Sequence, residues 1–246
     1  MQKHTVLFLA ADPSETRALA LDREARAIHK ELESAGYRER FEFVTRWIGE
    51  PLDLLRELRK LKPTVVHFSG RGTWGGEHRH GLFFKGLDGG ARFVSAQAIE
   101  RTFGAVGSTV KLVVLNGCYS EAQAEALLVH VDCVVGTSGS SHSDAARSFA
   151  IGFYGGLGDR ESVVVACEQG AAAMSLEGVH DEDLPWLRVR AGVDASQLVL
   201  KQALLGLKIA GGRLTGSRTQ EGRVRVRPDS SPPYVDVTPS CQFVVT

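Results

Sequence analysis

The residue of this 246-residue chain best placed for covalent chemistry is a cysteine between an apolar run and an expected helix. Cys118 follows the run 111–116 and a glycine, and a helix is expected to begin near Ser120. N–H groups at a helix N-terminus lower the pKa of a nearby thiol and can hold an oxyanion. On spacing alone, Cys118 fits a reactive thiol and a small buried cysteine equally well. Cys133 and Cys167 lie inside apolar runs, so we expect both to be buried and inert.

A second polar segment, HFSGRG at 67–72, follows a strand that we expect over 64–69. The run 111–116 is expected to be another strand, and it leads into NGC at 116–118. Ligands of an open parallel sheet bind at the carboxyl ends of its strands. If these two strands are neighbours, the two polar segments converge at one edge of the sheet.

The elements that must position these segments alternate between strand and helix. Short apolar runs predict buried strands at 5–10, 41–45, 64–69, 111–116 and 133–137. Helical spacing, helped by Pro51 and a cap at Ser95, predicts helices at about 21–35, 51–58, 95–102, 120–129, 143–157 and 162–174. The glycine-rich segment 70–92 is expected to be a functional loop with a small hairpin that includes 81–85. This order predicts an α/β fold, a mostly parallel sheet with helices on both faces.

The C-terminal part of the chain is less regular. Further candidate elements are strands at 187–190, 235–238 and 243–246, and a run with helical spacing at 196–207. From Lys208 the composition shifts to Gly, Ser, Arg and Pro. We therefore expect one domain over 1–207, followed over 208–246 by a connector with terminal strands that is a candidate regulatory segment.

Composition argues against several classes of protein. The 29 Lys and Arg residues balance the 29 Asp and Glu residues, so no net charge attracts nucleic acid or an anionic membrane. No apolar run approaches the roughly 20 residues of a membrane span, and the first run, 5–10, is too short for a signal peptide. The four cysteines lack the spacing of a disulfide framework or zinc site, and P-loop, dinucleotide and GxSxG motifs do not occur. We expect a cytoplasmic protein without a metal or other cofactor.

The two polar segments together resemble the paired active-site motifs of the CHAT proteases, a branch of the caspase-like cysteine peptidases that includes separase. That family ends one strand in a motif of the type HFSGHG and, after a further strand, ends another in NxC. This chain has HFSGRG at 67–72 and NGC at 116–118. The segments that resemble the next strand and helix of the family are VGT at 135–137, DAA at 144–146 and 149–154. The resemblance covers about residues 1–175.

The resemblance implies a caspase-like fold with Cys118 as the nucleophile. It also implies an oxyanion hole formed by the backbone N–H groups of Gly72 and Cys118, and protein substrates. The implied function is a bacterial cysteine endopeptidase of antiphage defence or cell death, switched on by a partner or by an upstream protease.

Arg71 stands where the family has its general-base histidine. A guanidinium stays protonated at any relevant pH, so it cannot accept the thiol proton or pass it to a leaving amine. It can still lower the pKa of Cys118 as a fixed positive charge. Three interpretations stay open: an engineered inactive form, a natural pseudoprotease that binds a protein partner, or a different histidine as the base.

The candidate substitutes are His67, His78 and His80. His67 lies inside an expected strand, about 13 Å along the chain from Arg71, and we expect it to be a buried structural residue. His78 and His80 lie on the glycine-rich loop, where we expect them to be solvated. That loop has no helix to fix ligand geometry, so these histidines do not predict a metal site.

Asp144 is the candidate specificity residue. One interpretation is that Asp144 caps the helix that follows it. The other is that it lines the pocket for the residue before the scissile bond, a role that the resemblance to arginine-specific caspase-like enzymes implies. A buried carboxylate there would favour Arg or Lys by charge-assisted pairing. Glu168 and Asp132 are weaker alternatives.

The connector is a candidate site of regulatory cleavage. Residues 211–227 carry five arginines among Gly, Ser and Thr. Proteases cut exposed connectors of this kind, and the resemblance implies maturation by a cut near Arg213, Arg218 or Arg223. The alternative is a solvated linker without a role.

Overall fold

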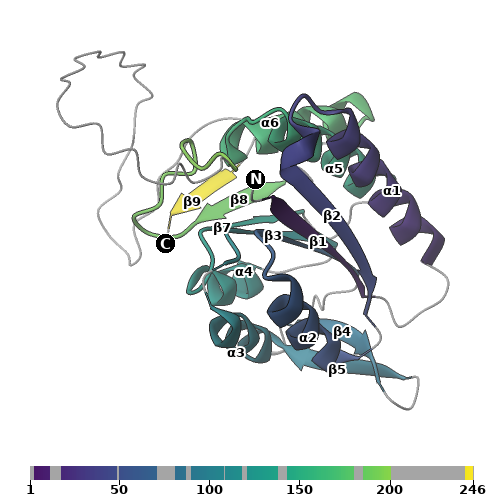
Figure 1. Ribbon diagram of the computed structural model, residues 1–246, viewed down its shortest axis with the longest axis vertical. Coiled ribbons are helices and arrows are strands. Elements are labelled where there is room, and N and C mark those ends of the chain that lie inside the picture. Colours follow the sequence, from purple (N-terminus) through teal and green to yellow (C-terminus); the bar gives the residue numbers. More distant parts are fainter. Residues whose placement is uncertain are drawn as a thin grey trace.

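The computed structural model of the chain describes residues 3–11, 18–48, 50–70, 81–86, 90–107, 109–117, 121–137, 143–179, 185–200 and 242–245. At its centre is a seven-stranded sheet in the order β2-β1-β3-β6-β7-β8-β9 (Figure 1). Its strands are β1 (His4–Ala11), β2 (Phe41–Trp47), β3 (Val65–Gly70), β6 (Leu112–Gly117), β7 (Cys133–Gly136), β8 (Trp186–Val189) and β9 (Gln242–Val245). The first five strands in this list are parallel, β8 is antiparallel to β7, and β9 is parallel to β8. The predicted mostly parallel α/β sheet is confirmed.

Helices cover both faces of this sheet, as predicted (Figure 1). One face carries α1 (Ala18–Ser34), α5 (Ser143–Gly158) and α6 (Val163–Leu176). The other face carries α2 (Pro51–Leu61), α3 (Ala96–Val106) and α4 (Glu121–Leu128). Side chains of β1 alternate between the two cores, with Val6 and Phe8 in the first and Leu7 and Leu9 in the second. The strands are thus buried on both faces, which explains their continuous apolar runs.

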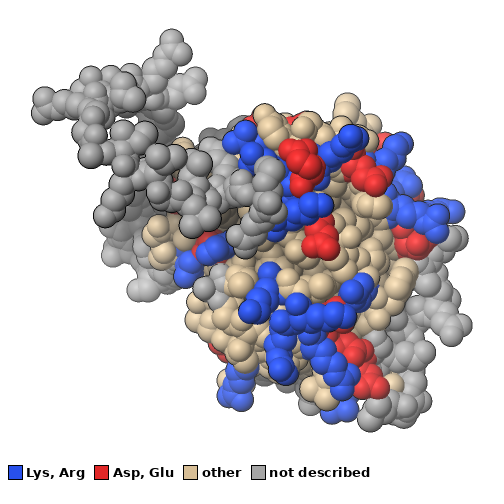
Figure 2. Space-filling model, in the orientation of Figure 1, with Lys and Arg blue, Asp and Glu red and all other residues tan. Residues whose placement is uncertain are grey.

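Helices α1 and α2 are amphipathic, and each buries its apolar stripe against the sheet. In α1 the predicted stripe is confirmed, because its members are all buried: Leu21, Ala25, Ile28 and Leu32. In α2, Leu54 and Leu58 face the core, while the last turn carries Arg59 and Lys60. Figure 2 shows Lys and Arg side chains gathered over the region of α2, with acidic side chains beside them.

The predicted helix starts at Pro51 and Ser95 are confirmed by local capping bonds. Glu50 and Asp53 form a reciprocal capping box around the first turn of α2. The Ser95 hydroxyl accepts a hydrogen bond from the backbone N–H of Ala98 at 3.2 Å and caps α3. These bonds pair N–H groups that a helix leaves without a partner in its first turn, so the sequence locates both starts.

The predicted small hairpin is confirmed as the antiparallel pair β4 (Gly81–Lys85) and β5 (Ala91–Ser95). Leu82 and Phe84 of β4 are buried in the same core as the apolar side chains of α3. The side-chain amide of Gln123 in α4 donates to the backbone oxygen of Gly81 at 2.6 Å. The hairpin is therefore fixed to the body of the domain, while 71–80 and 87–89 lie outside the described residues.

The C-terminal part differs from expectation in one element. The run 196–207 has helical spacing, but its described residues, 196–200, do not form a helix. They form a turn and an irregular stretch. The backbone oxygen of Leu198 instead accepts the N–H of Val163 at 3.0 Å, and Leu200 is buried beside α6. Tertiary packing therefore uses these apolar residues without a helix.

The candidate strands 187–190 and 243–246 are confirmed as β8 and β9. β9 lies beside β8 in the main sheet (Figure 1). The candidate strand 235–238 lies outside the described residues, and the division of the chain at 207 stays a prediction. Within the described parts of the chain, no helix combines the length and apolar character that crossing a membrane requires.

Candidate active site

Two neighbouring strands end side by side where the sequence predicts the site. Gly70, the last residue of β3, pairs in register with Gly117, the last residue of β6. The predicted convergence of the two segments is confirmed as far as these glycines. Arg71 and Cys118 are the next residues in the chain, and they lie, with Gly72, outside the described residues.

The end of β3 has room only for glycine. Gly70 also pairs with Ala11, the last residue of β1. A Cβ atom at position 70 would lie 2.0 Å from the backbone oxygen of Ala11, far inside van der Waals contact. The glycine therefore lets β3 approach β1 up to its last residue, and this fixes the point from which the chain continues into Arg71.

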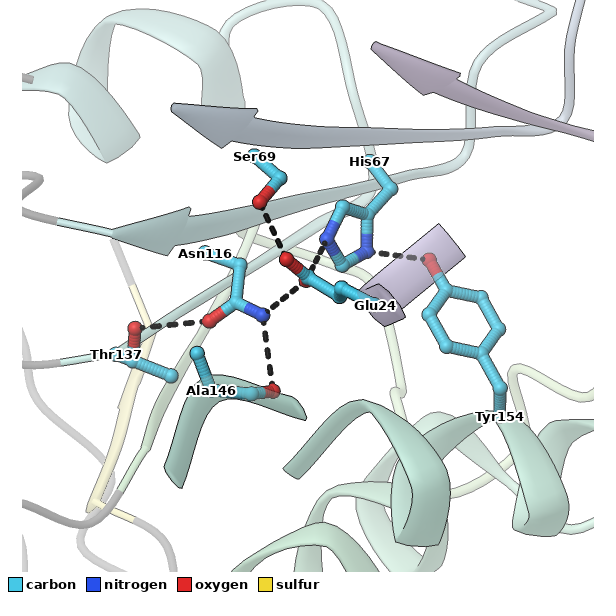
Figure 3. Close-up of polar contacts among 7 residues, drawn as sticks. All are labelled: Glu24, His67, Ser69, Asn116, Thr137, Ala146 and Tyr154. Carbon is cyan, nitrogen blue, oxygen red and sulfur yellow. Dashed lines mark hydrogen bonds and ion pairs between the residues drawn. The ribbon is translucent and has the colours of Figure 1, made fainter. Parts of the chain in front are cut away.

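A buried polar cluster joins α1 to β3 and β6 just before these strand ends (Figure 3). The carboxylate of Glu24 in α1 is at its centre. Its Oε1 lies 2.9 Å from His67 Nε2 and 2.5 Å from Asn116 Nδ2, and its Oε2 lies 2.5 Å from Ser69 Oγ. These four side chains are all buried. We call the following residues the Glu24 cluster: Glu24, His67, Ser69, Asn116, Thr137 and Tyr154.

Both ring nitrogens of His67 have partners. Nδ1 lies 2.9 Å from the hydroxyl of Tyr154, and the ring stacks on Phe8 with 4.9 Å between centroids. Burial, and then the charge of Glu24, raise the pKa of Tyr154 well above its ordinary value, so the hydroxyl keeps its proton. Nε2 is engaged as well, 2.9 Å from Glu24 Oε1. His67 is therefore a buried structural residue, as predicted.

Asn116 ties the end of β6 to the start of α5 (Figure 3). Its Nδ2 donates to the Glu24 carboxylate and, at 3.0 Å, to the backbone oxygen of Ala146. Its Oδ1 accepts the hydroxyl of Thr137 at 3.3 Å. Because both partners of Nδ2 are acceptors only, the orientation of the amide is determined by its contacts.

Asp144 lies in the first turn of α5, two residues before Ala146, and so at the same edge of the sheet as the strand ends. Its side chain is 77% exposed and lies 3.4 Å from the guanidinium of Arg147. The carboxylate is thus exposed here, where the predicted pocket role calls for a buried one. Its part in substrate binding stays a prediction.

The weaker specificity candidates lie elsewhere. Asp132 precedes β7 and so lies at the opposite edge of the sheet, where it forms ion pairs with Arg190 and, at 3.3 Å, with Lys111. Glu168 is exposed in α6. The remaining predicted residues lie outside the described part of the chain: His78, His80, Arg213, Arg218 and Arg223.

The expectation that Cys133 and Cys167 are buried is confirmed. Burial, and then the neighbouring charge of Asp132, raise the pKa of Cys133 to about 12. A thiol that stays protonated is a poor nucleophile, so Cys133 is inert.

Sequence reasoning missed Glu24, the centre of the cluster. Its position carried a signal, because it lies three residues after Leu21 and four before Ile28, on the apolar stripe of α1. A charged residue on a buried stripe needs polar partners. Those partners come from β3 and β6, and no local pattern identifies them.

The comparison with known proteins gives a likeness of fold. No protein-family model and no curated protein matches this chain. Two structures of a secreted C11 cysteine protease from Bacteroides thetaiotaomicron are similar, one of them in complex with an irreversible peptide inhibitor. They share 10% identity with this chain, with TM-scores of 0.51 and 0.55 over 70% and 76% of its length.

The matched region spans 62% and 66% of those two chains, less than two thirds of their length. At this identity the likeness concerns architecture: a mostly parallel sheet covered by helices on both faces. The chain has the caspase-like α/β fold of the C11 cysteine proteases.

Proposed function

We propose that this chain is built as a caspase-like cysteine endopeptidase, with Cys118 as its nucleophile and Arg71 in the place of its general base. The observation that carries this proposal is the register of Gly70 with Gly117, directly before these two positions. The likeness in fold to C11 cysteine proteases supports the same reaction class. P-loop, dinucleotide and GxSxG motifs do not occur in the sequence.

The proposed reaction is acyl transfer to a thiolate. The sulfur of Cys118 attacks the carbonyl carbon of the scissile peptide, and a C–S bond forms as the carbonyl electron pair moves onto oxygen. The backbone N–H groups of Gly72 and Cys118 hold that oxyanion. The C–N bond then breaks, the amine leaves with a proton from the general acid, and water hydrolyses the thioester.

Arg71 blocks the proton transfers in this sequence of steps. The guanidinium can stabilise the thiolate, but it neither accepts the thiol proton nor protonates the amine. His67 does not replace it, because the ring is fully buried and both nitrogens are engaged. We therefore expect the peptidase activity of this chain to be several orders of magnitude lower than that of a form with a histidine at position 71.

The proposed substrates are proteins cut after basic residues. Support comes from the place of Asp144 beside the strand ends and from its 3.4 Å ion pair with Arg147, whose guanidinium is the group that an Arg substrate would offer. The assignment to CHAT proteases rests on the motifs at 67–72 and 116–118. The proposed pathway, bacterial defence or cell death, rests on the same motifs. Regulatory cleavage near Arg213, Arg218 or Arg223 rests on composition.

A second function is favoured by Arg71 itself. If this residue is native, a chain with the same fold and no base is a pseudoprotease that binds a protein partner. The hydrogen bonds described for the Glu24 cluster join α1 to β3 and β6, and a binding module uses this packing as an enzyme does.

The test is peptide cleavage by five forms of the full chain: wild type, Cys118→Ala, Arg71→His, Arg71→Gln as an uncharged control, and Arg71→His with Cys118→Ala. We expect cleavage by Arg71→His alone. Robust cleavage by the wild type, abolished by Cys118→Ala, would show that another base serves. The peptide library places each of the amino acids in turn before the scissile bond. If a folded Arg71→His protein cleaves none of these peptides, the result would favour the pseudoprotease that binds a protein partner.

A further inference from the structure

Strand β2 lies at the end of the main sheet, where β1 is the only strand that pairs with it among the described residues (Figure 1). The N–H of Ile48, directly after β2, donates to the backbone oxygen of Ala10 in β1 at 2.9 Å. The direction of the N–H and C=O groups alternates along a strand, so the even positions of β2 point at β1 and the odd positions point away from it. An edge of this kind is a template for another strand.

The sequence of β2, FEFVTRW, is complementary to itself in the antiparallel direction. An added strand must place outward groups against outward groups, so odd positions of one copy pair with odd positions of the other. The register centred on Val44 meets this condition and pairs all seven residues of β2. Its pairs are Phe41 with Trp47, Glu42 with Arg46, and Phe43 with Thr45. Aromatic and opposite-charge pairs across two strands are stabilising.

Both members of the charged pair have capacity for a partner across the edge. Glu42 is exposed and accepts one hydrogen bond, from the hydroxyl of Thr5 at 3.3 Å. The side chain of Arg46 is 37% exposed. Its guanidinium donates from Nε to Glu57 and from Nη1 to the outward backbone oxygen of Thr45, which leaves three of its five N–H groups for another acceptor.

The opposite side of β2 presents an exposed indole and an open cavity. Trp47 is 53% exposed, and by alternation it lies on the same side of β2 as Phe41 and Phe43, which face α1. These two phenylalanines line a cavity of about 270 Å³ together with residues of α1 and with Arg38. In the register centred on Val44, Trp47 of a second copy lies opposite Phe41 and so at this cavity. Indole rings buried between apolar side chains and a guanidinium are strong contacts of protein interfaces.

We propose that β2 is a dimerisation surface, through which two copies of this chain pair antiparallel about a twofold axis at Val44. The same surface serves both copies, so each pair listed above occurs twice, as a twofold interface requires. β1 lies between β2 and β3, so this surface is separate from the candidate active site. The inference is therefore independent of the proposed reaction.

The first measurement is the molar mass of the full chain by sedimentation velocity, at concentrations from about 1 µM to about 1 mM, the range in which a small interface changes from free to bound. We expect the mass to rise from the 26.6 kDa of one chain to twice that value. A mass of one chain at every concentration would overturn the inference, and Arg46 would then be a residue that guards an open edge.

Charge reversal tests the register. Glu42→Arg and Arg46→Glu each place like charges opposite each other, so each should weaken self-association by about tenfold or more. An equal mixture of the two variants restores opposite charges in both pairs, so it should associate as the wild type does. Glu125→Arg is the control, because Glu125 is exposed in α4, which contacts β7. A mixture that associates no better than its components would overturn the register.

If Arg46→Glu does not fold, since it also loses the bond to Glu57, Trp47→Ala provides the test. It should weaken self-association by about tenfold or more, because the cavity of each copy loses its indole. Leu176→Ala is the matched control, because this leucine is 89% exposed in α6 and should leave self-association unchanged. Equal association of Trp47→Ala and the wild type would overturn the role of the cavity.

A disulfide across the axis measures the register directly. Val44 faces its own copy in a pair without hydrogen bonds, where Cα atoms lie about 4.5 Å apart, within the range that a disulfide spans. With Cys118 and Cys241 replaced by serine, Val44→Cys should therefore form a covalent dimer under mild oxidation. Thr45→Cys is the control, because the two copies of that position lie about 8 Å apart. Crosslinking of Thr45→Cys but not of Val44→Cys would overturn the inference.

Discussion

Gly70 and Gly117 end two neighbouring parallel strands in register, and each directly precedes a residue proposed to act in the site. The pair places both chain segments at the same level of the same sheet edge. Neighbouring strands lie about 4.8 Å apart, so side chains that follow two adjacent strand ends can come within reach of each other. The pairing of β3 with β6 is therefore the structural basis of the proposed site.

The close approach of Gly70 to β1 predicts a large loss of stability for Gly70→Ala. The added Cβ would meet the backbone oxygen of Ala11 at 2.0 Å, so the strands must separate. We expect the free energy of unfolding to fall by about 2–4 kcal/mol, measured by urea denaturation. Gly36→Ala is the control, because its Cβ would have an ordinary 3.5 Å contact with Asp159, and we expect a change within about 0.5 kcal/mol. Equal effects of the two changes would contradict the account of the strand end.

The exposure of Asp144 predicts a modest role in specificity. In the Arg71→His background, Asp144→Asn should lower kcat/KM for substrates with Arg before the scissile bond by a factor of about 2–5, because an exposed ion pair contributes little. A loss of about a hundredfold would instead show that substrate binding buries the carboxylate.

Arg147→Ala is the counterpart in the same experiment. Arg147 lies 3.4 Å from Asp144 and competes with a basic substrate for the carboxylate. Its removal should raise kcat/KM for Arg substrates and leave apolar substrates unchanged. A preference for apolar residues in the Arg71→His protein would exclude Asp144 as the specificity residue.

The raised pKa of Cys133 predicts a loss of stability in alkali. The folded thiol has a pKa of about 12 against an ordinary value of 9.0, so the unfolded chain releases this proton first. Its contribution to the free energy of unfolding is fully present below pH 9.0 and is lost as the pH rises toward about 12. Urea denaturation at a series of pH values should show this decline.

Cys133→Ala should reduce the alkaline decline without removing it, because burial also raises the pKa of Tyr154. Val135→Ala in the same strand is the control, and it should lower stability by a similar amount at every pH. If the slopes of the wild type and Cys133→Ala agree above pH 9.0, Cys133 does not titrate as its burial requires.

The position of β9 predicts that a cut in the connector leaves both fragments together. β9 pairs with β8 in the main sheet, so a chain cut near Arg213, Arg218 or Arg223 should elute as one species in gel filtration and give two bands after denaturation. Replacing both Phe243 and Val244 by proline removes two successive backbone N–H groups, one of which points at β8. The double substitution should therefore release the fragment. Separate elution without these prolines would contradict the stable pairing of β9.

The regulatory role of the connector needs its own test. We expect that an Arg71→His chain with all five arginines of 211–227 replaced by alanine stays uncut and has reduced activity. Full activity of the uncut chain would leave this segment as a linker.

The sequence by itself determined the order of strands and helices, because their signals are local. Apolar runs marked the buried strands, the spacing of Leu21, Ala25 and Ile28 marked the stripe of α1, and Ser95 marked the start of α3. Each signal involves residues within a few positions of one another, where the geometry of a single element decides which side chains share a face. The motifs at 67–72 and 116–118 likewise needed only short segments.

Only the tertiary structure decided which distant residues meet. It brought Glu24 against Asn116, 92 positions later in the chain, and it buried Leu200 and packed Leu198 against the core without a helix. A buried charge must be paired wherever donors are available, and apolar side chains are buried wherever the sheet and helices leave space. Those needs are met by residues far apart in the sequence, so the contacts that support the proposed site follow from the packed fold.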